Sequence, residues 1–263
     1  MPRSRSTMAG LATTAAAAGL VLAGCHSSSS ATASGTATSS APGAATAAAT
    51  ASSAASAGTT VAAGGAGSVA YFPDQLGDTW VYSVTQGANK GTVTNKVTGL
   101  KPAATGTEVT MTDTDTEFGS DKPFPIDYIV HSDGSISIPL DFGAGSGFKL
   151  KSGNLGWPSP SQLASGQPQN DTIVMTGSAG GTSITVTSKA VVKGEGTQSV
   201  SVPAGSYSAT VVDEVETEKV EGTPVTSQVK TWLVNGVGPV KDEVMDGTGG
   251  IDELEQLTSF TKG

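Results

Sequence analysis

The only thiol of this 263-residue sequence belongs to Cys25, which follows a segment typical of an export signal. That segment has two arginines, Arg3 and Arg5, and then an apolar stretch over residues 8–22. The stretch is shorter than the ~20 apolar residues that span a bilayer, and a basic start before it is characteristic of a signal peptide. Ala23 and Gly24 are small, so a peptidase can approach the backbone just before Cys25. We therefore expect residues 1–24 to be a signal peptide.

The tetrapeptide Leu22-Ala23-Gly24-Cys25 resembles the lipobox of bacterial lipoproteins. This resemblance implies that cleavage leaves Cys25 as the first residue and that its sulfur carries a thioether-linked diacylglycerol, with fatty acids such as palmitate. Two acyl chains anchor a protein stably, because each buried methylene contributes ~0.8 kcal/mol. The implied partner is thus the membrane, reached through a lipid anchor at Cys25. The implied location is the extracytoplasmic face of the cell membrane.

His131 is the one imidazole after residue 68, and it precedes Ser132 and Asp133. A catalytic histidine needs a nucleophile and an orienting carboxylate that converge in space. Neighbours in sequence on a hairpin do not converge in this way, so we expect an exposed histidine at a strand end. A hydrolase that uses His131 is the weaker alternative. The expectation is that the chain is not an enzyme and has no catalytic residues.

Acidic residues alternate in two runs, at Asp113, Asp115 and Glu117 and again at Glu214, Glu216 and Glu218. On a strand each run shares one face, and carboxylates at that spacing could take part in a Ca²⁺ site. An EF-hand loop counted from Asp113 would need Gly and Glu where this chain has Phe118 and Phe124. We therefore expect solvated strand faces and no metal site, with Ca²⁺ binding as the alternative.

The overall composition narrows the class of partner. After the two arginines the chain has 12 Lys against 23 acidic residues, a difference of −11. Nucleic-acid binding and docking on anionic lipid both need clustered basic side chains, so this balance argues against both. A single cysteine excludes an internal disulfide framework. No motif for a cofactor is present, and we expect none to bind.

Residues 25–68 contain the lipid-attachment cysteine and a linker. Positions 26–68 are almost entirely Ala, Ser, Thr and Gly, without Asp, Glu, Lys, Arg, Phe, Trp or Tyr. Such a segment cannot bury enough apolar surface to offset the entropy of ordering, so we expect disorder. The remaining residues, 69–263, have the size of one domain.

From residue 69 onward, hydrophobic and polar residues alternate between Gly-rich turns, which is the pattern of β-strands. We expect an all-β, mainly antiparallel fold, with a curled sheet that forms a barrel or half-barrel. The Asp133-Gly134 pair predicts a hairpin turn. The strands are expected at 79–86, 92–98, 108–118, 126–138, 172–176, 183–192, 198–202, 206–218, 226–234, 239–245 and 254–260.

Residues 141–171 form a long Gly-, Ser- and Pro-rich segment that contains Phe148 and Trp157. Loops of this length tend to be functional or disordered. The large aromatic residues predict a packed loop, with Trp157 filling the end of the barrel. The alternative is that Trp157 caps an apolar cavity or contacts a partner.

Several short motifs resemble a broad set of bacterial envelope β domains of unassigned function. They are Tyr71-Phe72-Pro73, Gly77-Asp78-Thr79-Trp80-Val81-Tyr82, Val202-Pro203-Ala204-Gly205 with Tyr207, Trp232 with Gly236-Val237-Gly238, and Leu257 with Phe260. This resemblance implies an exported β-rich domain, with a distant likeness in shape to half-barrel lipoproteins that carry lipid or sort other lipoproteins. The residues themselves predict structural roles, because Pro and Gly punctuate turns.

Together these features predict a lipid-anchored cell-envelope lipoprotein whose β domain binds an apolar ligand or an envelope protein without catalysis. A ligand-binding domain of this kind should have a cavity or concave face lined by Trp80, Tyr82, Val84 and Val211. The alternative is a structural or assembly module of the envelope that binds no small ligand.

Overall fold

The structure is a computed structural model, which describes residues 71–72, 75–116, 120–138, 148–153, 155–179, 182–220, 223–245 and 249–263. The expected signal peptide, Cys25 and the linker lie outside these residues. Within them the chain is almost entirely β-strand, and the one helix is α2, Pro160–Ser165.

The strands follow one another along the chain with few other elements between them. They are β1 (Thr79–Gln86), β2 (Asn89–Ala103), β3 (Gly106–Asp115), β4 (Ser120–His131), β5 (Ile136–Ile138), β6 (Phe148–Ser152), β7 (Leu155–Trp157), β8 (Gln169–Ala179), β9 (Thr182–Val202), β10 (Gly205–Val220), β11 (Thr223–Val234), β12 (Gly238–Met245) and β13 (Ile251–Thr261).

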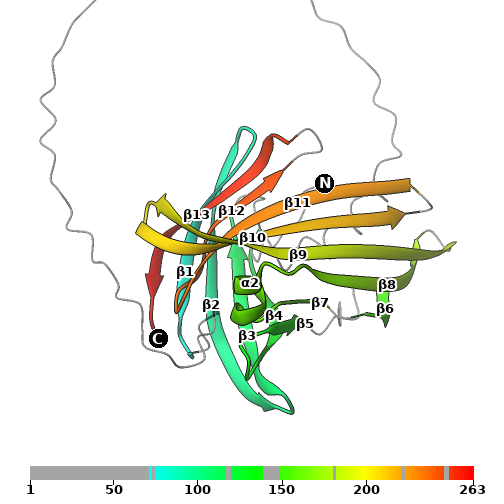
Figure 1. Ribbon diagram of the computed structural model, residues 1–263, viewed down its shortest axis with the longest axis horizontal. Helices are drawn as coiled ribbons and strands as arrows, with labels where there is room; N and C mark the ends of the chain where they lie inside the picture. Colours follow the sequence, from blue (N-terminus) through cyan, green and yellow to red (C-terminus); the bar gives the residue numbers. More distant parts are fainter. Residues whose placement is uncertain are drawn as a thin grey trace, which may run out of the picture.

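All thirteen strands belong to one antiparallel sheet, in the order β6-β8-β9-β10-β11-β12-β13-β1-β2-β3-β4-β5-β7. The first and last strands of the chain's β region, β1 and β13, pair in the middle of this order. The sheet curls, so that β1–β4 lie on one side of β8–β11 and run across their direction (Figure 1). The edge strands β6 and β7 are not paired with each other, so the described sheet is open. The predicted all-β half-barrel is therefore confirmed.

The turn chemistry follows the sequence closely. Gly134 has a φ of 79° in the hairpin between β4 and β5, where Ser135 N–H donates to Asp133 Oδ1 at 2.9 Å. The Pro203-Ala204 turn joins β9 directly to β10. The prediction from the sequence is wrong at residues 193–197, where it places a break between two strands. β9 continues through this stretch, and its extra residue, Glu195, forms a bulge opposite Val211 and Val212 of β10.

The prediction of a long loop over residues 141–171 is also wrong. This segment supplies β6, β7 and helix α2, and β8 begins at Gln169. The helix is defined by a capping box, in which the Ser159 hydroxyl accepts from Gln162 N–H and the Gln162 side chain accepts from Ser159 N–H. Gly166 ends the helix in a left-handed conformation. Short elements of three to six residues carry too little periodicity to be detected from the sequence.

One large hydrophobic core occupies the inner face of the curled sheet. It takes residues from both halves of the strand order, including Val97 and Val109 from β2 and β3 and Val211 from β10. Leu163 of α2 joins the same core, because the helix packs on β9 at Gly194. Val229 and Val244 form a separate small cluster.

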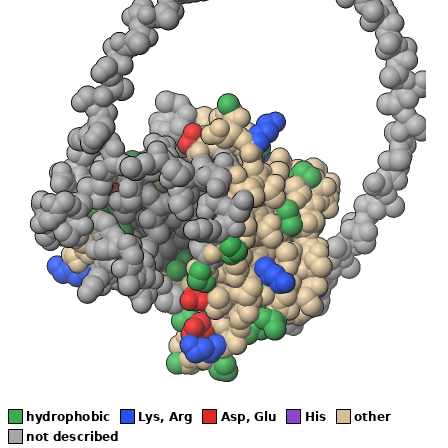
Figure 2. All heavy atoms as spheres, turned by 180° about the vertical axis from the view of Figure 1, so that it is seen from behind, with side chains coloured by type: hydrophobic (Ala, Val, Ile, Leu, Met, Phe, Trp, Pro, Cys, Tyr) green, Lys and Arg blue, Asp and Glu red, His purple; other side chains and the backbone are tan. Residues whose placement is uncertain are grey.

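The outer surface mixes polar, hydrophobic and charged side chains. Figure 2 shows single hydrophobic and charged side chains scattered over the face seen from behind, without a concentrated basic patch in its described part. Leu76, Leu100 and Ile251 are among the exposed large hydrophobic residues, and they come from different elements. Scattered apolar side chains of this kind are normal on a protein surface.

The contact between α2 and β9 yields a stability prediction. A Cβ added to Gly194 would lie 2.0 Å from the carbonyl oxygen of Leu163, so Gly194→Ala must displace the helix. We expect a fall of several degrees in the melting temperature, measured by circular dichroism. Thr197→Ala, at an exposed position of the same strand, is the matched control. Equal melting temperatures for the two variants would contradict this packing.

Candidate functional site

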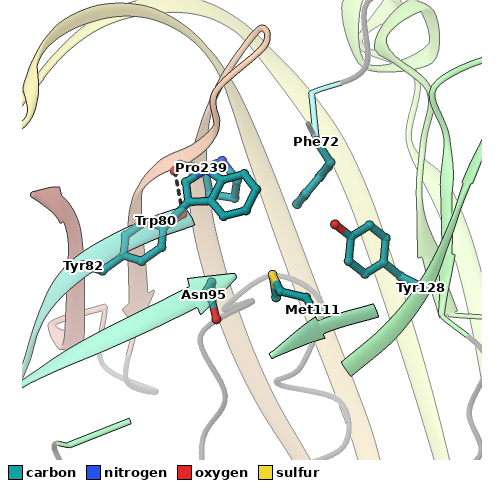
Figure 3. Close-up of a pocket in the computed structure, with 7 residues that line it drawn as sticks. All are labelled: Phe72, Trp80, Tyr82, Asn95, Met111, Tyr128 and Pro239. Atoms are coloured by element: carbon teal, nitrogen blue, oxygen red, sulfur yellow. Dashed lines mark hydrogen bonds between the residues drawn. The ribbon is translucent and has the colours of Figure 1, made fainter. Parts of the chain in front are cut away.

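A small cavity lies among aromatic side chains at one end of the inner face. Phe72 and Tyr128 lie on one side of it and Trp80 and Tyr82 on the other, with Met111 beside them (Figure 3). Asn95 and Pro239 complete its lining. The cavity has a volume of about 20 Å³, which is room for roughly one water molecule. The core at this end is therefore nearly filled.

Hydrogen bonds and ring contacts hold this lining in place. Trp80 Nε1–H donates to the carbonyl of Val237 at 2.5 Å, and the Tyr82 hydroxyl donates to the carbonyl of Pro239 at 3.0 Å. The first bond ties β1 to the turn between β11 and β12, and the second ties it to the start of β12. Phe72 packs edge-on against Trp157, with 5.7 Å between ring centroids. Trp157 is buried on the edge strand β7 and belongs to the main hydrophobic core, as expected for a packed aromatic residue.

The expected lining residues separate into two pairs. Trp80 and Tyr82 line the cavity, whereas Val84 and Val211 are buried in the hydrophobic core away from it. Val84 faces Glu255 across the β1–β13 ladder. The inner face therefore changes from aromatic to acidic along these strands.

Several carboxyl groups lie buried on the inner face, among them Asp113, Asp115 and Glu253. Five others are considered together, and we call them the inner carboxyl cluster: Glu214, Glu216 and Glu218 of β10, Asp242 of β12 and Glu255 of β13. Alternate residues of a strand share a face, so Glu255 lies on the face of Leu257 and Asp242 on that of Val240, both in the core. Glu255 is only 1% exposed and Glu214 3%. Asp242 faces Glu255 directly across the β12–β13 ladder.

The sequence-based interpretation of both acidic runs as solvated faces is wrong. Asp113 and Asp115 of β3 are buried, as are the three glutamates of β10, while Glu117 lies outside the described residues. Period-two alternation shows which residues share a face but does not show which face the curled sheet encloses. On β10 the register shift between Val211 and Val212, opposite the β9 bulge, also changes the facing, so that Val212 shares the inner face with Glu214.

Burial raises the pKa of these groups. It raises the pKa of Asp242 from 3.8 to about 7, although the hydrogen bond from the Thr231 hydroxyl opposes the shift. It raises the pKa of Glu218 from 4.5 to about 8, with a further contribution from the charge of Glu216. Burial also raises the pKa of Glu216 itself, against the hydrogen bond that its carboxylate accepts from the Ser188 hydroxyl.

In the remaining two members, Glu255 and Glu214, the charges of nearby acidic residues raise the pKa in addition to burial. Burial raises the pKa of Glu255 well above its ordinary value, and the charges of Asp242, Glu253, Asp113 and Asp115 add to this. For Glu214, burial is again the largest cause, followed by the charges of Glu216, Asp171, Asp242 and Asp213.

The acidic cluster and the aromatic cavity adjoin each other. Burial raises the pKa of Tyr82, and the charges of Glu255 and Asp242 raise it further. Tyr82 thus belongs to the cavity lining and also lies within electrostatic reach of the cluster. Sequence reasoning missed Asp242 and Glu255, and the only signal for them was alternation with Val240, Val244 and Leu257.

His131 is half-buried and does not have the exposed position expected for it. Its Nε2 lies 2.8 Å from Ser137 Oγ, and its Nδ1 lies 3.3 Å from the carbonyl oxygen of Thr105. The neighbouring carboxylate of Asp133 instead accepts hydrogen bonds from Ser135. The histidine therefore joins β4, β5 and the β2–β3 turn, and no carboxylate of a described residue is seen to orient it.

The described residues contain neither a metal-ligand group nor a membrane-spanning helix. Among the residues that the structure describes, no group of three or more His, Cys, Asp or Glu side chains is arranged to hold a metal ion. Within the same residues, no helix has the length and hydrophobicity needed to cross a bilayer.

Comparison with known proteins gives the fold a context. Residues 144–257 match the model of the DUF3108-like family. A solved Bacteroides fragilis protein, assigned as exported and with a YmcC-like fold, is 15% identical, with a TM-score of 0.54 over 74% of this chain and 100% of its own. A Parabacteroides distasonis protein assigned as a lipoprotein is 14% identical, with a TM-score of 0.56 over 73% of this chain and 99% of its own.

At these identities the two structures establish a shared fold. The predicted distant likeness to β-rich lipoproteins of unassigned function is confirmed at that level. No curated protein matches the sequence significantly.

The raised pKa values predict a stability that depends on pH. A carboxyl whose pKa is higher in the folded than in the unfolded state contributes stability below about pH 4, and this is lost as the pH rises through the folded value. For Asp242, with a pKa of 3.8 raised to about 7, the cost of ionisation is on the order of 4 kcal/mol at about 1.4 kcal/mol per pKa unit. We expect the melting temperature to fall between about pH 5 and pH 8.5.

Asp242→Asn should flatten this dependence and raise the melting temperature at the higher pH, because the neutral amide can still accept from Thr231. The measurement is thermal unfolding by circular dichroism at a series of pH values. Glu195→Gln, at an exposed position of β9, is the control and should follow the parent protein. A parallel pH dependence in both variants would refute the assignment to Asp242.

Proposed function

We propose that this chain is a lipoprotein of the bacterial cell envelope, anchored at the extracytoplasmic face of the cell membrane through Cys25. The observation that carries this proposal is Leu22-Ala23-Gly24-Cys25 at the end of an export signal. The fold supports it, because one of the two solved structures with this architecture is assigned as exported and the other as a lipoprotein. Diacylation at Cys25 would attach the β domain to the membrane without a spanning helix.

The β domain is proposed to be a non-catalytic binding domain for an apolar ligand or an envelope protein. Its open sheet has an inner face that combines an aromatic cavity with buried polar groups. Binding sites in proteins commonly combine an apolar lining with a few placed polar groups. The hydrogen bonds of His131 to Ser137 and Thr105 support a role in bracing the hairpin.

A second candidate, an assembly module without a small ligand, is favoured by the size of the aromatic cavity. A volume of about 20 Å³ does not admit an acyl chain unless Trp80 or Phe72 moves. In this case the binding partner would be another envelope protein.

The lipid anchor predicts a specific labelling result. The parent protein, expressed with a metabolically incorporated palmitate analogue, should carry the label, because the lipobox directs acylation to the cysteine thiol. Cys25→Ala should lose it, while Cys25→Ser tests whether the thiol itself is needed. Label retained in either variant, or treatment with globomycin that leaves processing unchanged, would refute the anchor.

Native mass spectrometry of the acylated protein, purified from its own envelope, separates the two functions of the domain. A binding domain for an apolar ligand should retain an adduct beyond the anchor, and widening the cavity with Met111→Ala should change the adduct population. A bare protein mass, together with one dominant partner in crosslinking, would replace the ligand-binding version with the assembly module.

A further inference from the structure

The inner carboxyl cluster holds an unusual set of hydrogen-bonding atoms. Both carboxylate oxygens of Glu255 lack a hydrogen-bond partner, as do Oε2 of Glu214 and Oε2 of Glu216. In Glu218 the same is true of Oε1. Buried polar atoms in proteins are normally paired, and each exception requires an explanation. Here several of them come together on one enclosed face.

All of these atoms are oxygens, and so is the unpartnered Oδ1 of Asn95 in the adjoining aromatic cavity. Ionised carboxylates only accept hydrogen bonds, so what they lack is a donor. The ion pairs between described residues, Lys101–Glu108, Lys193–Glu195 and Lys241–Glu243, do not include any member of the cluster. The described part of the protein therefore does not itself supply a cation to these five groups.

The spacing of the cluster indicates what kind of donor would fit. Successive inward residues of β10 are about 6.8 Å apart, at about 3.4 Å per residue, so Glu214 and Glu218 lie roughly 14 Å apart along the strand. From Asp242 to Glu255 the distance is one strand spacing, about 4.8 Å. Carboxyl groups spread in this way suit several separate cationic groups, and a compact metal ion would need its ligands gathered at one point.

Tyr82 and the cavity next to it provide an apolar and aromatic surface beside the acidic groups. At about 20 Å³ the cavity takes in methylene groups only if Trp80 or Phe72 moves, as for an acyl chain, and an ammonium group over an aromatic ring then gains cation–π attraction. The edge strands β6 and β7 are not paired with each other, so strand pairing does not close the described sheet on that side.

We propose that the inner carboxyl cluster binds an aliphatic polyamine, with ammonium groups at Glu214, Asp242 and Glu255 and methylene groups against Tyr82. This inference rests on the binding-domain part of the proposed function and is independent of the lipid anchor. The proposed ligand is therefore an aliphatic chain that carries positive charges, and it is not purely apolar.

The charge on the facing groups determines the pH dependence of this binding. Glu255 faces Asp242, Glu253, Asp113, Asp115 and Tyr82, and Glu214 faces Glu216, Asp171, Asp213 and Asp242. Glu218 faces Glu216, and Asp242 also contacts Thr231. None of these neighbours is basic. An arriving polyamine would displace protons from the cluster, so binding should strengthen as the pH rises.

The test is isothermal titration calorimetry of the purified full-length protein with spermidine, at about pH 6 and about pH 8. We expect tighter binding at the higher pH and proton release, seen as a difference in apparent enthalpy between buffers of unlike ionisation enthalpy. Glu214→Gln and Glu255→Gln should each weaken binding roughly tenfold or more, because each removes one partner of a buried charge pair. Glu195→Gln, outside the cluster, should leave the affinity unchanged.

Circular dichroism melts of each variant separate lost binding from lost folding, and the glutamine variants should fold because they neutralise buried acids. Unchanged spermidine affinity in both glutamine variants, or an equal loss in Glu195→Gln, overturns the proposal. Binding of a lysine-rich peptide without binding of spermidine overturns it in favour of a peptide partner. An apolar adduct in native mass spectrometry with no spermidine binding overturns only this inference and leaves the proposed function standing.

Discussion

Enclosure of one face of a curled antiparallel sheet is the constraint on which this structure depends. Every second residue of each strand must be accommodated on the inner face, whatever its chemistry. At one end this is simple, because Trp80, Val97 and Val109 are apolar and stabilise the fold by burial. Towards the other end the same face includes Glu214, Asp242 and Glu255. Their burial is tolerated when the carboxyls are neutral or when a cation accompanies them.

The core and the candidate site are therefore parts of one surface. The aromatic cavity is held by hydrogen bonds from β1 to the β11–β12 turn and to the start of β12. The acidic groups begin two residues further along, where Glu255 of β13 faces Val84 of β1. Polar groups buried at a cost to stability are common where a protein binds something. The separation of Val229 and Val244 from the main core is consistent with this, because the Thr231–Asp242 pair lies between.

The proposed lipoprotein would divide its work between the lipid anchor and the β domain. In that arrangement the acyl groups at Cys25 provide location, and the curled sheet provides recognition. Identities of 14–15% to the two solved structures establish a shared fold and leave the binding chemistry of each protein to its own inner face.

Local chemistry was enough to predict the strands, their antiparallel pairing and most of the turns, because alternation and residues such as Gly134 and Pro203 act over a few positions. It also gave the resemblance of residues 22–25 to a lipobox, because that motif is linear. It could not show that Glu214 and Glu255 are buried, since alternation leaves open which face becomes the inside and the register shift between Val211 and Val212 changes the facing. Short elements such as β7 and α2 were missed for a related reason: Trp157 and Leu163 are ordered by the distant core that they contact. Tertiary structure alone brought β10, β12 and β13 together, because strand neighbours in the sheet, and the charges they place side by side, are set by long-range pairing.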